Sequence, residues 1–273
     1  MFPLYDESNW QKLLRRPATE NGRPECLPRI TKYASPEARA LGLTPMEEYP
    51  DALIPWEKVQ ETIERCHREK IFPLYHQENA GVMKEWYQDG YGYCWAYGLT
   101  AAVMGCRAAE GQPPVRLSPF SLGWLVNWRN SGYYCDRAIA GARERGIAPA
   151  DYVPEYELNR RRFKDGWEQE AKKFRPLEWW DVDTSRGQKD VIRQCLTILA
   201  TGRPLYIAYN WWGHALECVG MRWDAGRVIW QVWNSHGDGV IELAGSRGVP
   251  DEAYGVRATS WGPGETSEKG GPA

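Results

Sequence analysis

The segment QDGYGYCWAY, residues 88–97, combines residue types that suit nucleophilic catalysis. Its cysteine, Cys94, stands at the foot of an expected helix, and the free amides and dipole at a helix N-terminus favour a thiolate over a thiol. Gly90 and Gly92 would let a substrate approach the backbone closely. Taken alone, this pattern fits a buried structural cysteine better than a nucleophile, so the assignment depends on partners elsewhere in the chain.

A thiolate nucleophile needs an imidazole to carry its proton and usually a third group to orient the ring. Among the four histidines, His214 lies in WWGHALECVGM, at the start of an expected strand. Asn234 lies in VWNSHGDG, at the end of the next expected strand. These two residues follow Cys94 by 120 and 140 positions, in the order Cys, His, Asn.

Three blocks resemble the papain-like cysteine peptidases over about residues 70–260. QDGYGYCWAY is similar to the family's Q-G-x-C-G-S-C-W-A-F block, GHALECVGM to its histidine strand, and WNSHGDGVIEL to its N-S-W-G-x-G-W-G block. The resemblance implies that Cys94 is the nucleophile, His214 its ion-pair partner and general acid, and Asn234 the residue that orients the imidazole. Gln88, six residues before Cys94, would donate to the oxyanion together with the Cys94 N–H. Gln77 in IFPLYHQ is a rival for that role, and spacing favours Gln88.

Several positions depart from the family pattern. Tyr91 replaces a half-cystine, so the nearby family disulfide cannot form, which favours a compact, disulfide-free member of bacterial or bacteriophage type. Tyr93 replaces the family's serine before Cys94 and is a bulky neighbour for the nucleophile. His236 replaces a tryptophan that shields the Asn–His hydrogen bond in the family, and Trp233 or another tryptophan could shield that bond here. The substrate-binding glycine pair becomes residues 131–132 or 132–133. The expected substrate-binding residues are Gly132, Tyr93, Trp212 and Gly213.

The secondary structure that must position these residues is predicted to change from helices to strands along the chain. Apolar residues at helical spacing predict helices from Pro55 to about residue 70, from Cys94 to about residue 110, from Asp136 as N-cap to about residue 145, and over residues 189–200. Short β-rich runs then follow: LYIAY, ALECVGM, VIWQVWN, GVIEL and YGVRAT. Helices followed by strands indicate an α+β fold.

The resemblance makes this fold papain-like, with a helical half carrying the Cys helix packed against an antiparallel β-barrel-like half and a cleft between them. We expect an extended N-terminal arm over residues 1–55. The papain-like domain spans 56–262, with its halves meeting near 160–161. Residues 263–273 form a flexible tail.

Composition excludes several other classes of protein. The 273 residues carry a net charge of −2 and a pI of about 6.2, which argues against a nucleic-acid binder. No apolar run approaches the ~20 residues that span a bilayer, and no signal peptide is recognisable, so a cytoplasmic protein is expected. The seven cysteines form no CxxC pair, and no glycine loop has phosphate-binding spacing, so we expect reduced thiols and no metal or cofactor.

The sequence therefore predicts a thiol-dependent peptide-bond hydrolase acting on a polypeptide substrate through an acyl-enzyme. One alternative is a weak or inactive papain-like docking protein, for example in a phage particle and therefore virion-associated. A second is a cell-wall peptide amidase, which the absence of a wall-binding repeat disfavours. The N-terminal arm is a candidate contact for a protein partner.

Overall fold

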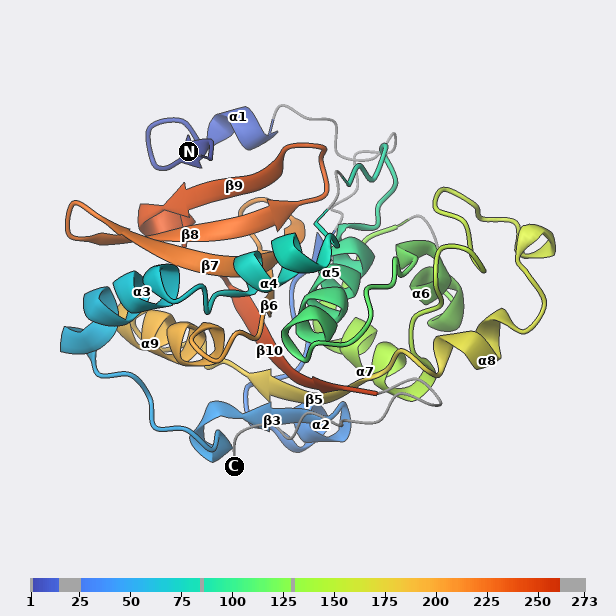
Figure 1. The fold of residues 1–273 in the computed structure, drawn as a ribbon, viewed down its shortest axis with the longest axis horizontal. Coiled ribbons are helices and arrows are strands. Elements are labelled where there is room, and N and C mark those ends of the chain that lie inside the picture. The colour runs from blue at the N-terminus through green and yellow to red at the C-terminus, as the bar shows by residue number, and fades with distance from the viewer. Residues whose placement is uncertain (1, 15–25, 84–85, 129–130, 261–273) are drawn as a thin grey trace.

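The computed structural model describes residues 2–14, 26–83, 86–128 and 131–260 (Figure 1). In this part of the chain an eight-stranded mixed sheet has the order β1-β9-β8-β7-β6-β10-β5-β3, and a small parallel ladder joins β2 to β4. The strands are β1 (Leu4–Tyr5), β2 (Cys26–Leu27), β3 (Leu43–Pro45), β4 (Tyr133–Tyr134), β5 (Pro176–Asp181), β6 (Leu205–Tyr209), β7 (His214–Asp224), β8 (Arg227–Asn234), β9 (Gly239–Ala244) and β10 (Glu252–Thr259).

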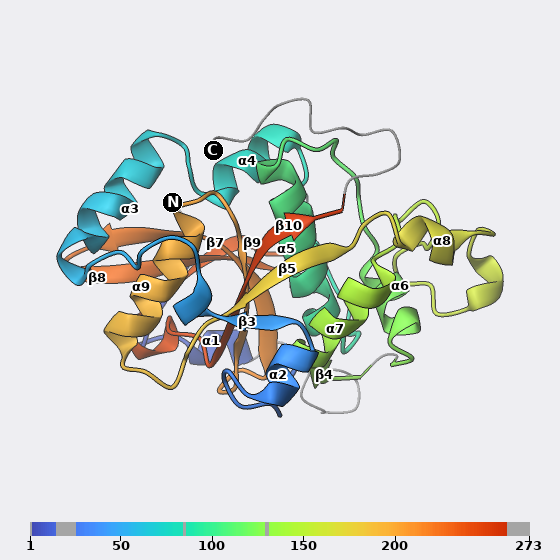
Figure 2. The same ribbon diagram turned by 90° about the horizontal axis from the view of Figure 1, so that it is seen from below.

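The helices divide between the two sides of the molecule. The first group, α5 to α8, lies beside the sheet and forms the helical half, whereas α3 and α9 cover the sheet on the other side (Figures 1 and 2). The helices are α1 (Gln11–Leu14), α2 (Pro36–Ala40), α3 (Val59–Arg68), α4 (Pro73–Ala80), α5 (Cys94–Ala109), α6 (Pro119–Leu125), α7 (Cys135–Arg145), α8 (Trp167–Ala171) and α9 (Gln188–Leu199), with 3-10 turns η1 (Met46–Glu48), η2 (Trp56–Lys58), η3 (Arg160–Arg162) and η4 (Gly245–Arg247).

The central strands are apolar on both faces because both faces are covered. In β6, Leu205 and Ile207 join the core beneath α3 and α9, whereas Tyr206 and Ala208 join the core of the helical half. Side chains alternate between the two faces of a strand, so a strand between two cores must be apolar throughout. This explains why LYIAY reads as a continuous apolar run.

Contact between α5 and β7 sets the relative position of the two halves. Gly98 in α5 lies so close to β7 that a Cβ there would be 3.0 Å from backbone atoms of Leu216. Cys94 is one helical turn before Gly98, and His214 is two residues before Leu216. The glycine thus lets the helix that begins with Cys94 rest directly on the strand that begins with His214.

The N-terminal 55 residues contribute strands at three places. β1 pairs in parallel with β9 at one edge of the large sheet, and β3 pairs in parallel with β5 at the other edge. Between them, β2 pairs in parallel with β4 on the helical half. The arm therefore runs from one sheet edge, past the helical half, to the opposite edge (Figures 1 and 2).

The α+β prediction, with a helical half against a largely antiparallel sheet, is confirmed. One local prediction is wrong: Asp136 is not the N-cap of its helix. The N-cap is Tyr134, two residues earlier, and the helix begins at Cys135; the buried Asp136 carboxylate accepts from the Thr31 hydroxyl at 2.7 Å. A long-range contact with the arm has taken the place of a local cap. The expected tail, 263–273, lies outside the described residues.

Candidate active site

His214 and Asn234 meet at one end of the antiparallel pair β7 and β8. His214 is the first residue of β7 and Asn234 is the last of β8. The imidazole Nε2 lies 3.0 Å from Asn234 Oδ1, a hydrogen bond in which the ring N–H donates. Asn234 Nδ2 donates in turn to Asp238 at 3.3 Å. The bond fixes which imidazole nitrogen faces the asparagine.

Aromatic rings flank the imidazole. The ring centroids of Trp212 and His236 lie 4.5 and 4.3 Å from that of His214. Trp233 stacks instead on Trp86, at 5.0 Å, so Trp212 and His236 are the rings that flank His214. His214 itself is only 1% exposed.

Cys94 is the first residue of α5 and is fully buried. The indole N–H of the next residue, Trp95, donates to Gly92 O at 3.1 Å and to Ser131 O at 3.0 Å. The Tyr206 hydroxyl of β6 donates to Trp95 O at 2.9 Å. These bonds tie the start of the helix to the preceding loop, to the helical half and to the sheet.

Gln88 links the cysteine loop to the asparagine loop. Ser235, next to Asn234, donates its hydroxyl to Gln88 Oε1 at 2.6 Å, and Gln88 N donates to Ser235 O at 2.8 Å. Gln88 Nε2 donates to Tyr91 O at 2.7 Å. The rival Gln77 instead donates to buried Glu217 at 2.7 Å, close to Gly105 and about 16 Å along the helix from Cys94. Ser235 was missed as a site neighbour, although it stands in the same NSH motif as Asn234.

Tyr93 points into the helical half. Its side chain is fully buried, with its ring edge-on to Phe120 at 5.0 Å and to Trp95 at 5.6 Å. Its hydroxyl fills the space that a side chain at Gly123 would need. The bulky residue before Cys94 is thus accommodated by a glycine in α6.

The expected substrate-binding backbone faces the arm. Gly213, in the left-handed region at φ +64°, ends the tight turn from β6 to β7, and its carbonyl accepts from Cys26 N at 2.8 Å. On the helical half, β4 follows Gly132 directly, and its Tyr133 lies opposite Cys26. The carbonyl of Gly132 accepts from the Trp128 indole at 2.7 Å. Strand β2 therefore bridges the residue before His214 and the wall beside Gly132.

A buried charge cluster anchors the arm just beyond β2. Arg29 donates to both carboxylate oxygens of Asp181 at 2.7 and 2.6 Å, and its backbone N–H donates to Glu252 at 2.6 Å. The Tyr254 hydroxyl also donates to Glu252, at 2.9 Å. Burial raises the pKa of Glu252 to about 7, against the lowering effects of Tyr254 and Arg29. Burial likewise raises the pKa of Asp181, opposed by Arg29.

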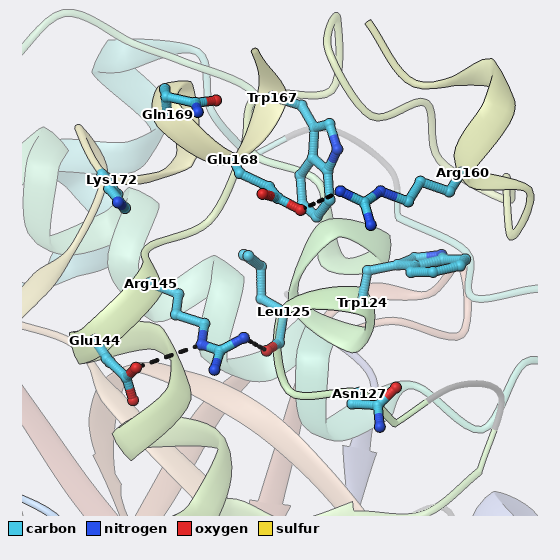
Figure 3. Close-up of a pocket in the computed structure, with 10 residues that line it drawn as sticks. All are labelled: Trp124, Leu125, Asn127, Glu144, Arg145, Arg160, Trp167, Glu168, Gln169 and Lys172. Carbon is cyan, nitrogen blue, oxygen red and sulfur yellow. Dashed lines mark hydrogen bonds and ion pairs between the residues drawn. The ribbon is translucent and has the colours of Figure 1, made fainter. Parts of the chain in front are cut away.

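A cavity of about 560 Å³ lies between α6, α7 and α8 (Figure 3). In it Arg160 pairs with Glu168 at 2.6 Å, and Arg145 donates to Leu125 O at 2.9 Å. No cysteine or histidine lines it, which separates it from the site around His214.

Across the described residues no group of three or more His, Cys, Asp or Glu side chains could hold a metal ion. The described helices include none with the length and apolarity to cross a membrane.

No family model matches the sequence, and no curated protein matches it. Solved structures do match. Xylellain, a cysteine protease from Xylella fastidiosa, is 17% identical with a TM-score of 0.54, covering 89% of this chain and 98% of that one. Digestive procathepsin L 3 of Tenebrio molitor larval midgut is 14% identical with a TM-score of 0.51, covering 84% and 94%.

The proform of the ragweed pollen cysteine protease Amb a 11 is 18% identical with a TM-score of 0.51, and the match covers 68% of this chain and 65% of that one. The chain thus spans about two thirds of that protein. Two of these three structures are described as cysteine proteases and the third as a procathepsin L. The chain has the fold of the papain-like cysteine proteases.

Proposed function

We propose that this chain is a thiol-dependent hydrolase of peptide bonds in which Cys94 is the nucleophile. The observation that carries the proposal is the 3.0 Å bond from His214 to Asn234, made at the start of a strand on which the Cys94 helix rests. With Nε2 engaged by the asparagine, the ring's Nδ1 is the atom assigned to the thiol proton. The N-terminus of a 16-residue helix favours the thiolate.

In the proposed reaction, the Cys94 Sγ electron pair bonds to the carbonyl carbon of the scissile peptide, and the carbonyl π electrons move to oxygen. The Cys94 N–H and the Gln88 amide stabilise that oxyanion. Collapse of the tetrahedral adduct breaks the C–N bond, and the leaving amine takes the proton from His214. Water then gives a proton to His214 and attacks the thioester, which releases the carboxylic acid and restores the thiol.

The substrate we propose is an extended, unstructured polypeptide. Strand β2 supplies the argument, because Cys26 uses an extended backbone to bond Gly213 O while pairing with β4. A substrate strand would use the same backbone groups. Since β2 already holds them, the described chain is a latent form, which becomes competent when this segment lifts.

A second candidate is a non-catalytic docking protein on the same fold. The observation in its favour is the burial of Cys94, which is fully buried, together with that of His214. A chain that never lifts β2 would keep the papain-like shell without turnover.

Labelling by an epoxide-type inactivator of thiol proteases separates the two candidates. We expect an adduct on Cys94, located by mass spectrometry, together with cleavage of an unfolded protein substrate. Labelling should be slow in the wild type and faster in Arg29→Met with Asp181→Asn, which removes the anchor of the arm. Cys94→Ala should abolish both readouts, whereas the matched control Cys66→Ala, a buried thiol in α3, should change neither. Absence of the adduct in both the wild type and the anchor variant would establish the docking alternative.

A further inference from the structure

Two cysteines that are distant in sequence lie in contact beside the candidate site. The Sγ atoms of Cys26 and Cys135 are 3.4 Å apart, although 109 residues separate them. Both side chains are buried, at 5% and 0% exposed. Cys26 belongs to the arm strand β2, and Cys135 begins α7 directly after β4. The pair therefore joins the segment that covers the site to the wall beneath it.

The ladder between β2 and β4 holds the two residues close together. Strands β2 and β4 pair in parallel, with Cys26 opposite Tyr133 and Leu27 opposite Tyr134. Cys135 is the next residue after that ladder. A disulfide has an S–S distance of about 2.05 Å, so the sulfurs need to approach by only about 1.4 Å. Figure 2 shows β4 and α7 adjoining the arm.

We propose that Cys26 and Cys135 form a reversible disulfide that fastens the N-terminal arm across the active site. The regulatory meaning of this bond rests on the proposed hydrolase function, whereas its formation does not. The oxidant is a low-molecular-weight disulfide of the glutathione type. One protein thiolate attacks it, releasing one small thiol and leaving a mixed disulfide; the second protein thiolate displaces the other small thiol. Two protein thiols are oxidised and one small disulfide is reduced to two thiols.

The surroundings of the pair set the conditions for this exchange. Contact with Cys135 lowers the pKa of Cys26, but burial and the nearby Cys94 raise it by more, to about 11. Burial raises the pKa of Cys135 well above its ordinary value. Both groups are therefore thiols at neutral pH, and exchange requires either alkaline pH or transient lifting of the arm. The reduced form is the one described by the structure.

The test of bond formation uses the full chain carrying Cys94→Ala, so that it is independent of catalysis. After incubation with oxidised glutathione at mildly alkaline pH, we expect a mass loss of about 2 Da and a crosslinked peptide pair containing Cys26 and Cys135. Amide exchange at Cys26, whose N–H bonds to Gly213, should slow at least tenfold on oxidation. The same crosslink should form when Cys66→Ala is added as a control.

Other results overturn the proposal. These are glutathione adducts without the crosslink, a different pairing, or a crosslink that leaves amide exchange unchanged. In the chain with Cys94 intact, a bond between Cys26 and Cys94 would also overturn it. Because these readouts use the folded chain without mutation of Cys26 or Cys135, a folding defect at either position cannot obscure them.

A second measurement addresses regulation in the chain with Cys94 intact. Oxidised glutathione can also form a mixed disulfide with a single reactive thiol. A dilute monothiol removes such a mixed disulfide. It does not remove a disulfide within the protein, because the two protein thiols re-form that bond intramolecularly. We expect epoxide labelling of oxidised wild type to recover only with a dithiol, and that of oxidised Cys135→Ser to recover with the monothiol. Equal recovery of both proteins would contradict regulation of the site by the Cys26–Cys135 disulfide. If the crosslink forms and Cys94 is never labelled in reduced protein, the hydrolase proposal fails while the disulfide stands.

Discussion

At the scale of single residues, the imidazole of His214 is confined on several sides. Asn234 holds Nε2 at 3.0 Å, and the rings of Trp212 and His236 lie against the imidazole. A ring that is held before the reaction needs little reorganisation when it gains and gives up a proton. The polar bond sets the direction of the ring, and the flanking rings keep water away from it.

The variant Asn234→Ala tests this arrangement. It removes the acceptor for Nε2 without touching Cys94, so we expect kcat/KM to fall at least tenfold with KM changed little, because the lost interaction acts on proton transfer. Steady-state kinetics on an unstructured peptide provides the measurement. Asn159→Ala, an exposed asparagine that caps η3, is the matched control and should retain the wild-type rate. Equal rates for both variants would remove Asn234 from the orienting role.

Sequence reasoning finds residues that stand in a motif and misses those joined by folding alone. Gln88 and Asn234 were singled out by their spacing from Cys94 and by the blocks around them. The contact between Cys26 and Cys135 has no such signal, because 109 residues separate them and neither stands in a paired motif. Only the ladder between β2 and β4 brings these two thiols together.

At the scale of elements, the close packing of α5 on β7 fixes the distance between the helix that begins with Cys94 and the strand that begins with His214. In a helix interior, Gly98→Ala gains about 1 kcal/mol of helix propensity. The new Cβ would, however, lie 3.0 Å from the backbone of Leu216, which cannot rotate away. We therefore expect a net loss on the order of 1 to 2 kcal/mol in the free energy of unfolding, together with slower labelling of Cys94.

Urea unfolding and epoxide labelling measure the two effects of Gly98→Ala. The matched control is Gly187→Ala, where φ is −58° and nothing lies within 4 Å of the added Cβ. That variant should stay within about 1 kcal/mol of the wild type, because alanine restricts the unfolded chain but is less favourable than glycine at the N-cap of α9. If Gly98→Ala is as stable and as reactive as Gly187→Ala, the helix–strand contact does not limit the site.

The first residue of strand β10, Glu252, makes the stability of the fold depend on pH. Its folded-state pKa of about 7 lies above the ordinary 4.5, so the folded chain holds this proton longer than the unfolded chain does. The stabilisation is fully present below about pH 4.5 and is lost as pH rises to about 7. Tyr254, Arg29 and Asp136 are the neighbours that act on its pKa, and the thiols of Cys26 and Cys135 also lie close enough to interact with it.

The variant Glu252→Gln mimics the protonated acid at every pH. We expect the wild type to lose stability relative to this variant between pH 5 and pH 8, by an amount on the order of 3 kcal/mol. Urea unfolding of both proteins across that range provides the comparison, in which shared groups cancel. A constant difference across the range would mean that Glu252 is ionised throughout.

Helices and strands whose apolar residues recur at regular spacing could be predicted from the sequence, and those without such spacing could not. Helices α3, α5 and α9 and the strands from β6 onward follow apolar patterns, and all were expected close to their observed bounds. Strands β1, β2 and β3 have only two or three residues each, which is too short for alternation to show. Their positions depend on the partner strands β9, β4 and β5, which a local pattern cannot reveal.

At the scale of the whole molecule, the arm belongs to the fold at both ends. β1 extends the sheet beyond β9 and β3 extends it beyond β5, so the covering segment cannot leave as a free tail. Its two ends hold β2 at a high effective concentration near the site. We therefore expect access to Cys94 to depend on how strongly Arg29 anchors the segment between those edges.

We expect the Arg29–Asp181 anchor to affect stability and access to Cys94 in separable ways. Arg29→Met alone leaves the Asp181 carboxylate, 1% exposed, without its bidentate partner, so we expect a loss of about 3 to 5 kcal/mol in unfolding free energy. Adding Asp181→Asn removes the buried charge and should recover most of that loss. Both proteins lack the anchor, so epoxide labelling of Cys94 should be at least tenfold faster than in the wild type, and equally fast in the two.

The matched control is Arg160→Met with Glu168→Gln, an exposed pair at 2.6 Å whose removal should cost at most about 1 kcal/mol and leave labelling unchanged. If the anchor double variant is labelled at the wild-type rate, the arm does not control access to the site. If labelling instead follows stability, faster in the single variant than in the double, general loosening of the fold explains the reactivity.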